Sequence, residues 1–235
     1  MNNIEHVISP DRLLLVWRSS QAGASRTRRV VAEVVADAEA SNATLRYLHD
    51  TPDFLRAQEE GFGGYPAFNV KQVEHSKNVL DSFLRRLPPR KRGDFQRYLD
   101  GYGIPPGLRL TDMALLAYTN AKLPSDGFEL YADLRQARPP FELVIEIAGF
   151  RHQDAVTIDD IYVGDPVKFK LEPDNAHDCN AVAVFHSGLR IGYIDKAQAP
   201  SFQTWLRKGY HLSAVVERVN GTADRPVIYV YVAVR

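Results

Sequence analysis

Residues 167–194 read VKFKLEPDNAHDCNAVAVFHSGLRIGYI, and this stretch decides how the C-terminal part of the chain folds. Apolar and charged residues alternate over 167–171, which predicts a strand with one buried and one solvated face. Residues 181–185 and 191–194 predict two further strands, with a turn at Ser187-Gly188 between them. The sequence Pro173-Asp174-Asn175 is typical of a turn. We therefore expect three consecutive strands, the first two joined by a polar loop.

The loop of residues 172–180 is dense in hydrogen-bonding side chains. Five of them fall within seven residues: Asp174, Asn175, His177, Asp178 and Asn180. Polar loops held between rigid strands often carry binding sites. Asx turns, in which such side chains bond to their own backbone, are also common. The residues alone leave both interpretations open, a self-satisfied loop and a binding site.

The spacing of this loop resembles a known family. The run EPDNAHDCNAVAV at 172–184, followed by GLRIGYI at 188–194, is similar to the HIRAN domain. Upstream, LVIEIAGFRH at 143–152 resembles that family's first strand and its Gly-x-Arg turn. Downstream, DKAQAP at 195–200 and WLRKG at 205–209 resemble its short helical connection and the Gly before the next strand. The resemblance covers about residues 141–235 and implies an OB-like β-barrel that binds DNA, with the 3′ end of a single strand as ligand.

The resemblance also implies roles for individual residues. Arg151 would contact phosphate, which suits a guanidinium group, and Asp178 would accept a hydrogen bond from the terminal 3′-hydroxyl. Asn175 and His177 would line the pocket beside Asp178. Its opposite wall would be formed by Tyr193 and Lys196. With His152, which follows the phosphate-binding Arg, the candidate DNA-binding residues are Arg151, His152, Asn175, His177, Asp178, Tyr193 and Lys196.

Two departures from the family pattern affect base stacking. His152-Gln153 stands where the DNA-binding members have a Tyr-Tyr pair, and His177 replaces an aromatic residue of the loop. Stacking of one base on an aromatic ring is worth about 1–3 kcal/mol. We therefore expect weaker binding of single strands than in those members.

Composition sets the outer limits. The chain has 235 residues, 45% of them hydrophobic, and Lys+Arg and Asp+Glu both number 29. Without net charge there is no bulk attraction to nucleic acid, so DNA binding must depend on a local patch. Basic runs occur at 26–29, 85–86 and 90–92, and each is more often a solvated face than a binding site. A single cysteine, Cys179, excludes an intramolecular disulfide.

Targeting and membrane signals are not found in the sequence. No stretch approaches the roughly 20 apolar residues that cross a bilayer, and the N-terminus has no basic-then-apolar leader pattern. We expect a cytoplasmic protein without a membrane partner.

The run RQARPP at 135–140 suggests a short stiff linker. We predict an α+β fold with two domains, residues 1–138 and 141–235. In the first, apolar runs at 13–17, 30–35 and 43–48 predict strands of a small sheet. Helices are indicated near 52–58, 79–87, 95–99 and 113–120, with a capped start at Asp50-Thr51-Pro52 and a cap at Thr111-Asp112.

Residues 13–131 resemble, more distantly, the N-terminal subdomain of HipA toxin kinases. The segment FLRRLPP at 83–89 matches that family's Phe-x-Asn-Leu-Leu-Pro helix, with Arg85 in place of the Asn. The segment from Ala114 to Gly127 matches a Leu-Leu-x-x-x-Gly-x-Asp-x-x-Gly run, with Thr119 or Asn120 in place of the middle Gly. The resemblance implies an accessory domain that contacts a kinase or an antitoxin.

Enzyme chemistry has no clear carrier in the sequence. A phosphate-binding Gly-rich loop with its Lys, a catalytic-loop Asp with its Asn, a Gly-x-Ser-x-Gly elbow and zinc-ligand spacing are all missing. We expect no enzyme activity, cofactor or metal. The leading hypothesis is a DNA-binding protein for single strands or 3′ ends, coupled to the HipA-like domain in a toxin–antitoxin or genome-defence setting. The alternative is a protein–protein regulator without DNA binding, whose partner is a HipA-like kinase or another protein.

Overall fold

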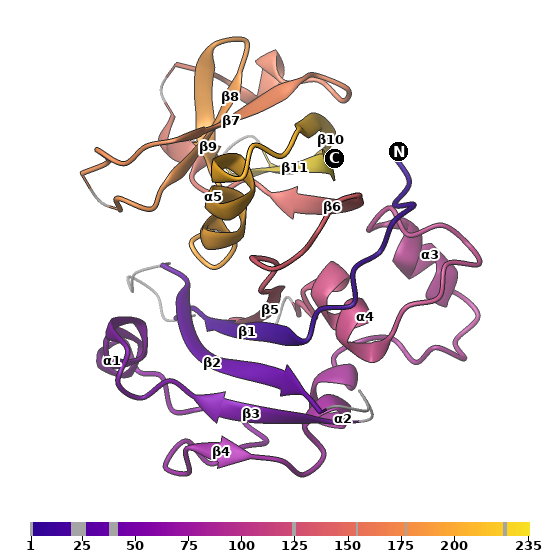
Figure 1. Ribbon diagram of the computed structural model, residues 1–235, viewed down its shortest axis with the longest axis vertical. Helices are drawn as coiled ribbons and strands as arrows, with labels where there is room; N and C mark the ends of the chain where they lie inside the picture. The colour runs from indigo at the N-terminus through magenta and orange to yellow at the C-terminus, as the bar shows by residue number, and fades with distance from the viewer. Residues whose placement is uncertain are drawn as a thin grey trace. The chain divides into compact units, whose positions relative to one another are not determined.

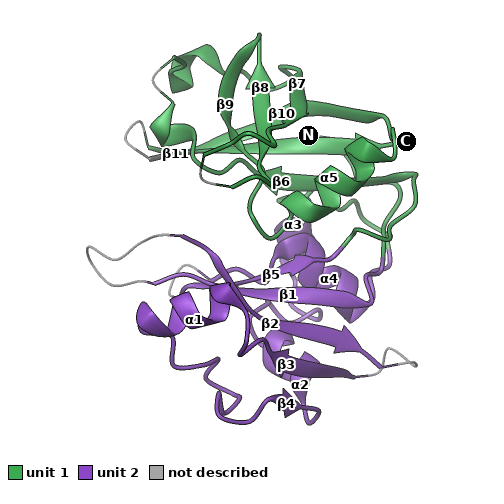
Figure 2. Cartoon of the chain, turned by 60° about the vertical axis from the view of Figure 1, so that its left-hand side comes forward, with its two compact units in different colours: residues 1–8, 100–108, 134–235 green, residues 9–99, 109–133 purple. Residues whose placement is uncertain are grey.

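The computed structural model describes residues 2–19, 27–37, 42–123, 126–153, 155–176, 178–222 and 225–235. The chain divides into two compact units that alternate along the sequence, as Figure 2 shows in green and purple. Unit 1 contains residues 1–8, 100–108 and 134–235, and unit 2 contains residues 9–99 and 109–133. We predicted two domains, residues 1–138 and 141–235. Compact units do not show which parts of the chain fold independently, so that division stays a prediction. No helix of the described ranges is long and apolar enough to cross a bilayer.

Unit 2 is built on one antiparallel sheet with the strand order β4-β3-β2-β1-β5. Figure 1 shows β1 to β4 side by side in this order. The strands are β1 (Arg12–Trp17), β2 (Arg29–Ala36), β3 (Ala43–Tyr47), β4 (Glu74–His75) and β5 (Phe128–Ala132), and the helices are α1 (Pro52–Glu59), α2 (Val79–Leu84), α3 (Phe95–Asp100) and α4 (Asp112–Thr119). The first three strands coincide with the apolar runs that predicted them.

Side-chain caps set the starts of two helices. The Thr51 hydroxyl accepts a hydrogen bond from the Phe54 amide at 3.3 Å, and Pro52 occupies the first turn of α1. The Thr111 hydroxyl accepts from the Ala114 amide at 3.1 Å at the start of α4. Capped starts were predicted at both places from the sequence, and the structure assigns the caps to Thr51 and Thr111.

Unit 1 contains two three-stranded antiparallel sheets, ordered β10-β11-β6 and β7-β8-β9. Their strands are β6 (Phe141–Glu146), β7 (Val167–Leu171), β8 (Val182–His186), β9 (Leu189–Tyr193), β10 (Leu212–Thr222) and β11 (Arg225–Val234). Helix α5 (Ala199–Arg207) buries Phe202 and Trp205 completely, against Phe169 and Phe141. The mixed helix and strand content, with antiparallel pairing throughout, agrees with the α+β class predicted.

The two sheets of unit 1 meet at two seams, each made by one isolated antiparallel bridge. Ala148 bridges to Tyr193 at one seam, and Pro166 bridges to Val215 at the other. The expected OB-like barrel is therefore not closed by continuous strand pairing in the described part of the chain. Proline has no N–H to extend a ladder, and Gly149, with φ +78°, turns the chain out of the strand conformation.

Gly192 makes the first seam possible. Its φ is +144°, and a Cβ at this position would lie 2.4 Å from the Ala148 carbonyl oxygen and 2.7 Å from Ile147 Cγ2. The Ala148 amide donates to the Tyr193 carbonyl, and the Tyr193 amide donates to the Ala148 carbonyl, both at 2.9 Å. The absence of a side chain therefore lets the two backbones exchange these bonds.

A buried carboxylate, that of Glu142 on β6, joins both ends of the chain to unit 1. Its Oε2 accepts from the backbone amides of Glu5 at 3.0 Å and His6 at 2.7 Å. Its Oε1 accepts from His6 Nδ1 at 3.0 Å and from the C-terminal Arg235. Burial by itself raises the pKa of Glu142, but these bonds outweigh burial and hold the pKa below its ordinary value.

We predict that Gly192→Ala lowers the free energy of unfolding by about 2–4 kcal/mol, because overpacking and an unfavourable positive φ add together. Gly93→Ala is the matched control, since a Cβ at Gly93 meets nothing within 4 Å. Its effect should stay within about 0.5 kcal/mol. Urea unfolding of the two variants and wild type measures both values, and equal effects would contradict a tight seam.

We predict that Glu142→Gln costs about 1.5–3 kcal/mol at pH 7, the usual worth of hydrogen bonds to a charged group. Because the folded-state pKa lies below 4.5, the stabilisation is complete above the unfolded-state pKa. It is lost as the pH falls through the folded-state pKa. Unfolding free energies of wild type and Glu142→Gln should therefore converge in acid. Glu5→Gln removes an exposed carboxylate of the same segment and serves as the control. A constant gap between wild type and Glu142→Gln over this pH range would refute the assignment.

Candidate functional site

The outer face of the β7-β8-β9 sheet carries cations and aromatic rings. Two rows cross it: Lys170 pairs with Ala183, which pairs with Tyr193, and Lys168 pairs with Phe185, which pairs with Arg190. Alternation along the strands sends Val167, Val184 and Ile191 into the core instead. We name the set of Lys168, Lys170, Phe185, Arg190 and Tyr193 the basic–aromatic face.

Arg190 is held in place from three sides. Its guanidinium lies over the Tyr193 ring, 5.1 Å from the ring centroid. Its Nε donates to Gln153 Oε1 at 3.0 Å, and its Nη1 lies 3.5 Å from Glu172 Oε1. The Arg190 side chain is still 43% exposed. It therefore offers an oriented guanidinium to an incoming anion.

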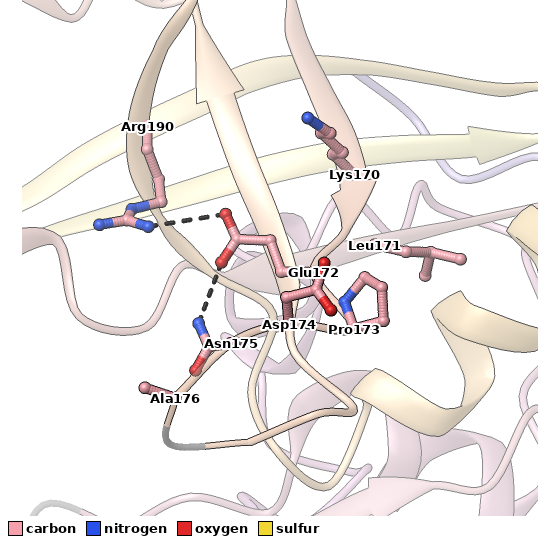
Figure 3. A pocket seen from close by; sticks show the side chains of 8 residues that line it. All are labelled: Lys170, Leu171, Glu172, Pro173, Asp174, Asn175, Ala176 and Arg190. Atoms are coloured by element: carbon pink, nitrogen blue, oxygen red, sulfur yellow. Dashed lines mark hydrogen bonds and ion pairs between the residues drawn. The ribbon is translucent and has the colours of Figure 1, made fainter.

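A triangle of hydrogen bonds orients Tyr193. Asn175 Nδ2 donates to Glu172 Oε2 at 3.0 Å and to the Tyr193 hydroxyl at 3.2 Å. The Tyr193 hydroxyl donates to Glu172 Oε2 at 3.1 Å. Figure 3 shows the Arg190 and Asn175 side chains both directed at the Glu172 carboxylate. The loop 172–180 and strand β9 are thus joined through side chains.

These contacts shift two pKa values in opposite senses. Burial alone raises the pKa of Glu172, but hydrogen bonds from Asn175 and Tyr193 and the charge of Arg190 bring it below its ordinary value. Burial, with the neighbouring Glu172 carboxylate, raises the pKa of Tyr193. At neutral pH Glu172 is therefore charged and the Tyr193 hydroxyl keeps its proton.

A hollow of about 480 Å³ opens beside this cluster. Cations and carboxylates both line it (Figure 3), and its residues are Lys170, Leu171, Glu172, Pro173, Asp174, Asn175, Ala176 and Arg190. Apolar groups of Leu171, Pro173 and Ala176 share the lining with the charged side chains, so the hollow can take a ligand that has both charged and apolar parts. No group of three His, Cys, Asp or Glu side chains suited to a metal ion occurs in the described ranges.

The loop also satisfies its own backbone. Asn175 Oδ1 accepts from the Asp178 amide at 3.1 Å, and Asp178 Oδ1 accepts from the Asn180 amide at 2.8 Å. Gln203 Nε2 on α5 donates to the Asn180 carbonyl at 2.8 Å. The two interpretations that the sequence left open are therefore compatible, because the same loop closes on itself and lines a hollow.

The structure brings together three of the candidate residues, Asn175, Asp178 and Tyr193. Arg151 and His152 lie exposed on the short helix η1 (Phe150–His152), where Arg151 Nε donates to His152 Nε2 at 3.0 Å. That bond requires His152 Nε2 to be unprotonated. Gln153, the next residue after η1, accepts a hydrogen bond from Arg190. It thereby connects η1 to the hydrogen-bonded side chains of Glu172, Asn175 and Tyr193.

The two remaining candidates are placed differently. Lys196 is exposed in the turn before α5. His177 lies outside the described residues. The DNA contacts assigned to all seven candidates stay predictions.

Sequence reasoning missed most of the basic–aromatic face. Lys168 and Lys170 were placed on the wet face of a strand but not in a site, and Arg190 and Glu172 were given no role. The alternation of residues 167–171 indicated that the two lysines are exposed. Their neighbours on the face follow from the strand register. That register becomes visible only when the three strands are aligned.

Comparison with known proteins identifies the C-terminal region. Residues 140–234 match the family model of the HIRAN domain, which confirms the resemblance predicted for residues 141–235. Comparison with curated proteins gives no match. The resemblance of residues 13–131 to the HipA subdomain stays a prediction.

Two solved structures are similar to part of the chain. The HIRAN domain of human HLTF is 17% identical over 40% of this chain and 74% of that chain, with a TM-score of 0.32. A protein from Lactobacillus plantarum is 22% identical over 39% of this chain and 92% of that chain, with a TM-score of 0.34.

We predict that Asn175→Ala lowers the free energy of unfolding by about 1–3 kcal/mol, because it leaves partly buried partners without hydrogen bonds. Hydrogen exchange at the Asp178 amide should also become faster, since that amide loses its acceptor. Asp174→Ala, in the same loop and exposed, is the control and should change little. Urea unfolding and exchange mass spectrometry measure both effects. Unchanged exchange at Asp178 would show that Asn175 does not hold the loop.

Proposed function

We propose that this protein binds single-stranded DNA, with a preference for 3′ ends, on the basic–aromatic face of unit 1. The HIRAN domain is a nucleic-acid-binding domain, and residues 140–234 match its family model. The observation that carries the finer proposal is the Arg190–Tyr193 pair, a stacked cation and ring fixed by Glu172, Asn175 and Gln153.

The charge distribution supports a polyanionic ligand. The chain has no net charge, so attraction must be local. Lys168 and Lys170 are exposed and make no ion pair with any described residue, and Arg190 keeps part of its guanidinium exposed. Glu172 follows the end of β7, so its carboxylate neutralises part of the positive charge there and not along the rest of the strand. The three cations lie on β7 and β9, on either side of β8, and offer several contacts to a polyanionic backbone.

The aromatic part of the face supports a single strand over a duplex. An unpaired base can stack on a ring whatever its sequence, whereas a paired base is covered by its neighbours. The Tyr193 ring is held in a fixed orientation by its hydroxyl contacts. It compensates in part for the aromatic pair that His152-Gln153 replaces, because one rigid platform remains beside an arginine.

The strand polarity in this proposal follows the family pattern. Arg151 on η1 holds a phosphate, and Asp178, fixed by Asn175 and Asn180, accepts the terminal 3′-hydroxyl. His152, Lys196 and His177 complete the contact. The OB-like character of the domain belongs to the proposal, since the seams leave the sheets only partly joined.

Unit 2 has a different part in the proposal. We infer from the resemblance to HipA that it contacts a protein partner, a HipA-like kinase or another protein, in a toxin–antitoxin or genome-defence setting. The chain acts in the cytoplasm as a binding protein and not as an enzyme. If DNA plays no part, the same surfaces belong to a protein–protein regulator. A pull-down from native lysate that recovers one kinase and no nucleic acid would favour that alternative.

We predict that Arg190→Ala weakens binding of labelled single strands by about tenfold or more, the effect of losing a phosphate contact and a stacking neighbour. Asp178→Ala should bind a strand with a blocked 3′ end like wild type, but should lose the preference for a free 3′-hydroxyl. Arg207→Ala, an exposed arginine on α5, is the control. Fluorescence anisotropy at low salt measures all four proteins.

Two outcomes would separate the parts of the proposal. Equal affinity for free and blocked ends in wild type would remove end recognition and leave single-strand binding. Binding by Arg190→Ala that equals that of Arg207→Ala would remove the basic–aromatic face as the site.

A further inference from the structure

A second concentration of positive charge lies in unit 2, outside the region that matches the HIRAN domain. Residues 85–97 read RRLPPRKRGDFQR and contain six of the 29 Lys and Arg residues of the chain, with Asp94 as their single carboxylate. The segment leaves α2 and runs into α3 (Figure 1). In a chain without net charge, such a run requires a structural or functional reason.

Structure accounts for three of the six cations. Arg86, whose side chain is 6% exposed, binds Asp126 with two hydrogen bonds of 2.7 and 2.8 Å. Arg90 pairs with Asp112 at 2.6 Å, and Arg92 pairs with Asp94 at 2.6 Å. Arg86 and Arg90 thus hold the segment to other parts of unit 2, and Arg92 pairs within the segment itself.

The other cations of the segment have no such role. Arg85, Lys91 and Arg97 are exposed and make no ion pair or hydrogen bond through their side chains with any described residue. On the sheet of the same unit the pattern is different, since Arg12 and Arg46 both pair with Glu33. Three unpaired cations therefore lie within this one segment, while Lys71 and Lys77 are exposed elsewhere in unit 2.

A hydrogen bond to a backbone carbonyl brings one more cation, Arg109, next to this segment. Arg90 Nη2 donates to the Leu110 carbonyl at 3.3 Å as well as to Asp112, so the segment is fixed to the start of α4. Lys91 and Arg109 are the chain neighbours of the two residues joined there, and Arg109 is exposed and unpaired in the described structure. We name residues 85–97 together with Arg109 the basic loop.

The chemistry of the basic loop suits phosphate groups. Five of the six cations in residues 85–97 are arginines, whose planar guanidinium matches phosphate oxygens. The Phe95 and Tyr98 rings lie 6.2 Å apart on the same face of α3, next to Arg97 in sequence. Arginines beside aromatic rings are typical of nucleic-acid surfaces rather than of sites for acidic peptides.

We propose that the basic loop is a second nucleic-acid contact, which holds the sugar–phosphate backbone without reading its sequence or its end. The inference takes its ligand from the proposed function, but it uses other residues and predicts another signature. In the proposed function, Asp178 determines the preference for a free 3′ end. The basic loop would leave that preference unchanged and would add its own phosphate contacts to the salt dependence of affinity.

The test compares two triple variants of the full chain by fluorescence anisotropy over a range of salt concentrations. One variant combines Lys91→Gln, Arg97→Gln and Arg109→Gln. The control combines Arg56→Gln, Lys71→Gln and Lys77→Gln, which removes three exposed charges elsewhere in unit 2. The probes are a labelled single strand with a free 3′ end, the same strand with a blocked 3′ end, and a blunt duplex. Thermal unfolding confirms that both variants are folded.

The expected result is a loss of affinity for all three probes in the basic-loop variant alone. Each phosphate contact contributes about 0.7 to the salt slope for a single strand and about 0.9 for a duplex. Loss of three contacts should therefore lower the slope by about 2 or more, while any preference for a free 3′ end is kept. The control variant should keep the slope of wild type.

Different outcomes overturn different claims. A wild-type slope in the basic-loop variant, or equal losses in both triple variants, would refute the second contact and leave the proposed function standing. Duplex binding that depends on the basic loop, without any single-strand or end preference, would refute the proposed function and retain the second contact. Competition by poly-glutamate as strong as by DNA of equal charge would show a surface for acidic protein and overturn the inference.

Discussion

The seam between Ala148 and Tyr193 is the constraint on which the C-terminal unit depends. At this point the sheet that holds the chain ends meets the sheet that carries the basic–aromatic face. A side chain at Gly192 would occupy the space of the Ala148 carbonyl, so the two backbones can exchange their hydrogen bonds only over a glycine. The seam determines where Tyr193 stands relative to η1, because Gly149 begins that short helix one residue after Ala148. The packing of the unit and the geometry of its site therefore have one common cause.

Glu172 places a carboxylate within a surface that we propose to bind an anion. Alone, its charge would repel phosphate. In the structure it accepts hydrogen bonds from Asn175 and Tyr193 and pairs with Arg190, so its charge is used within the protein. An arginine without such a partner would lose more side-chain freedom on binding a ligand. The Glu172 carboxylate thus weakens the attraction for phosphate, but it holds Arg190 and the Tyr193 ring in position before a ligand binds.

Much of the site could be predicted because its determinants are local in sequence. The turn at Pro173-Asp174-Asn175, the strands on either side and the cap at Thr111 follow from residues within a few positions of one another. The basic–aromatic face could not be found in this way, because Lys170 and Tyr193 meet only through the register of three strands. The packing of residues 1–8 and 100–108 with the C-terminal region was equally hidden. Nothing in the sequence near Glu142 indicates that its carboxylate binds the amides of Glu5 and His6.

Net neutrality has a different meaning once the ion pairs are known. Equal numbers of acidic and basic residues suggest at first a protein with no electrostatic preference. Most of the carboxylates described above hold particular cations, as Asp126 holds Arg86 and Glu33 holds Arg12. Among the described cations left without a partner, Lys168 and Lys170 lie together on the outer face of β7, and Arg85, Lys91, Arg97 and Arg109 lie in the segment between α2 and α4. A screened field acts over about 8 Å at physiological salt, so a ligand at either surface responds to this local excess and not to the sum. Neutrality of the whole chain is therefore compatible with a local excess of cations at these two surfaces.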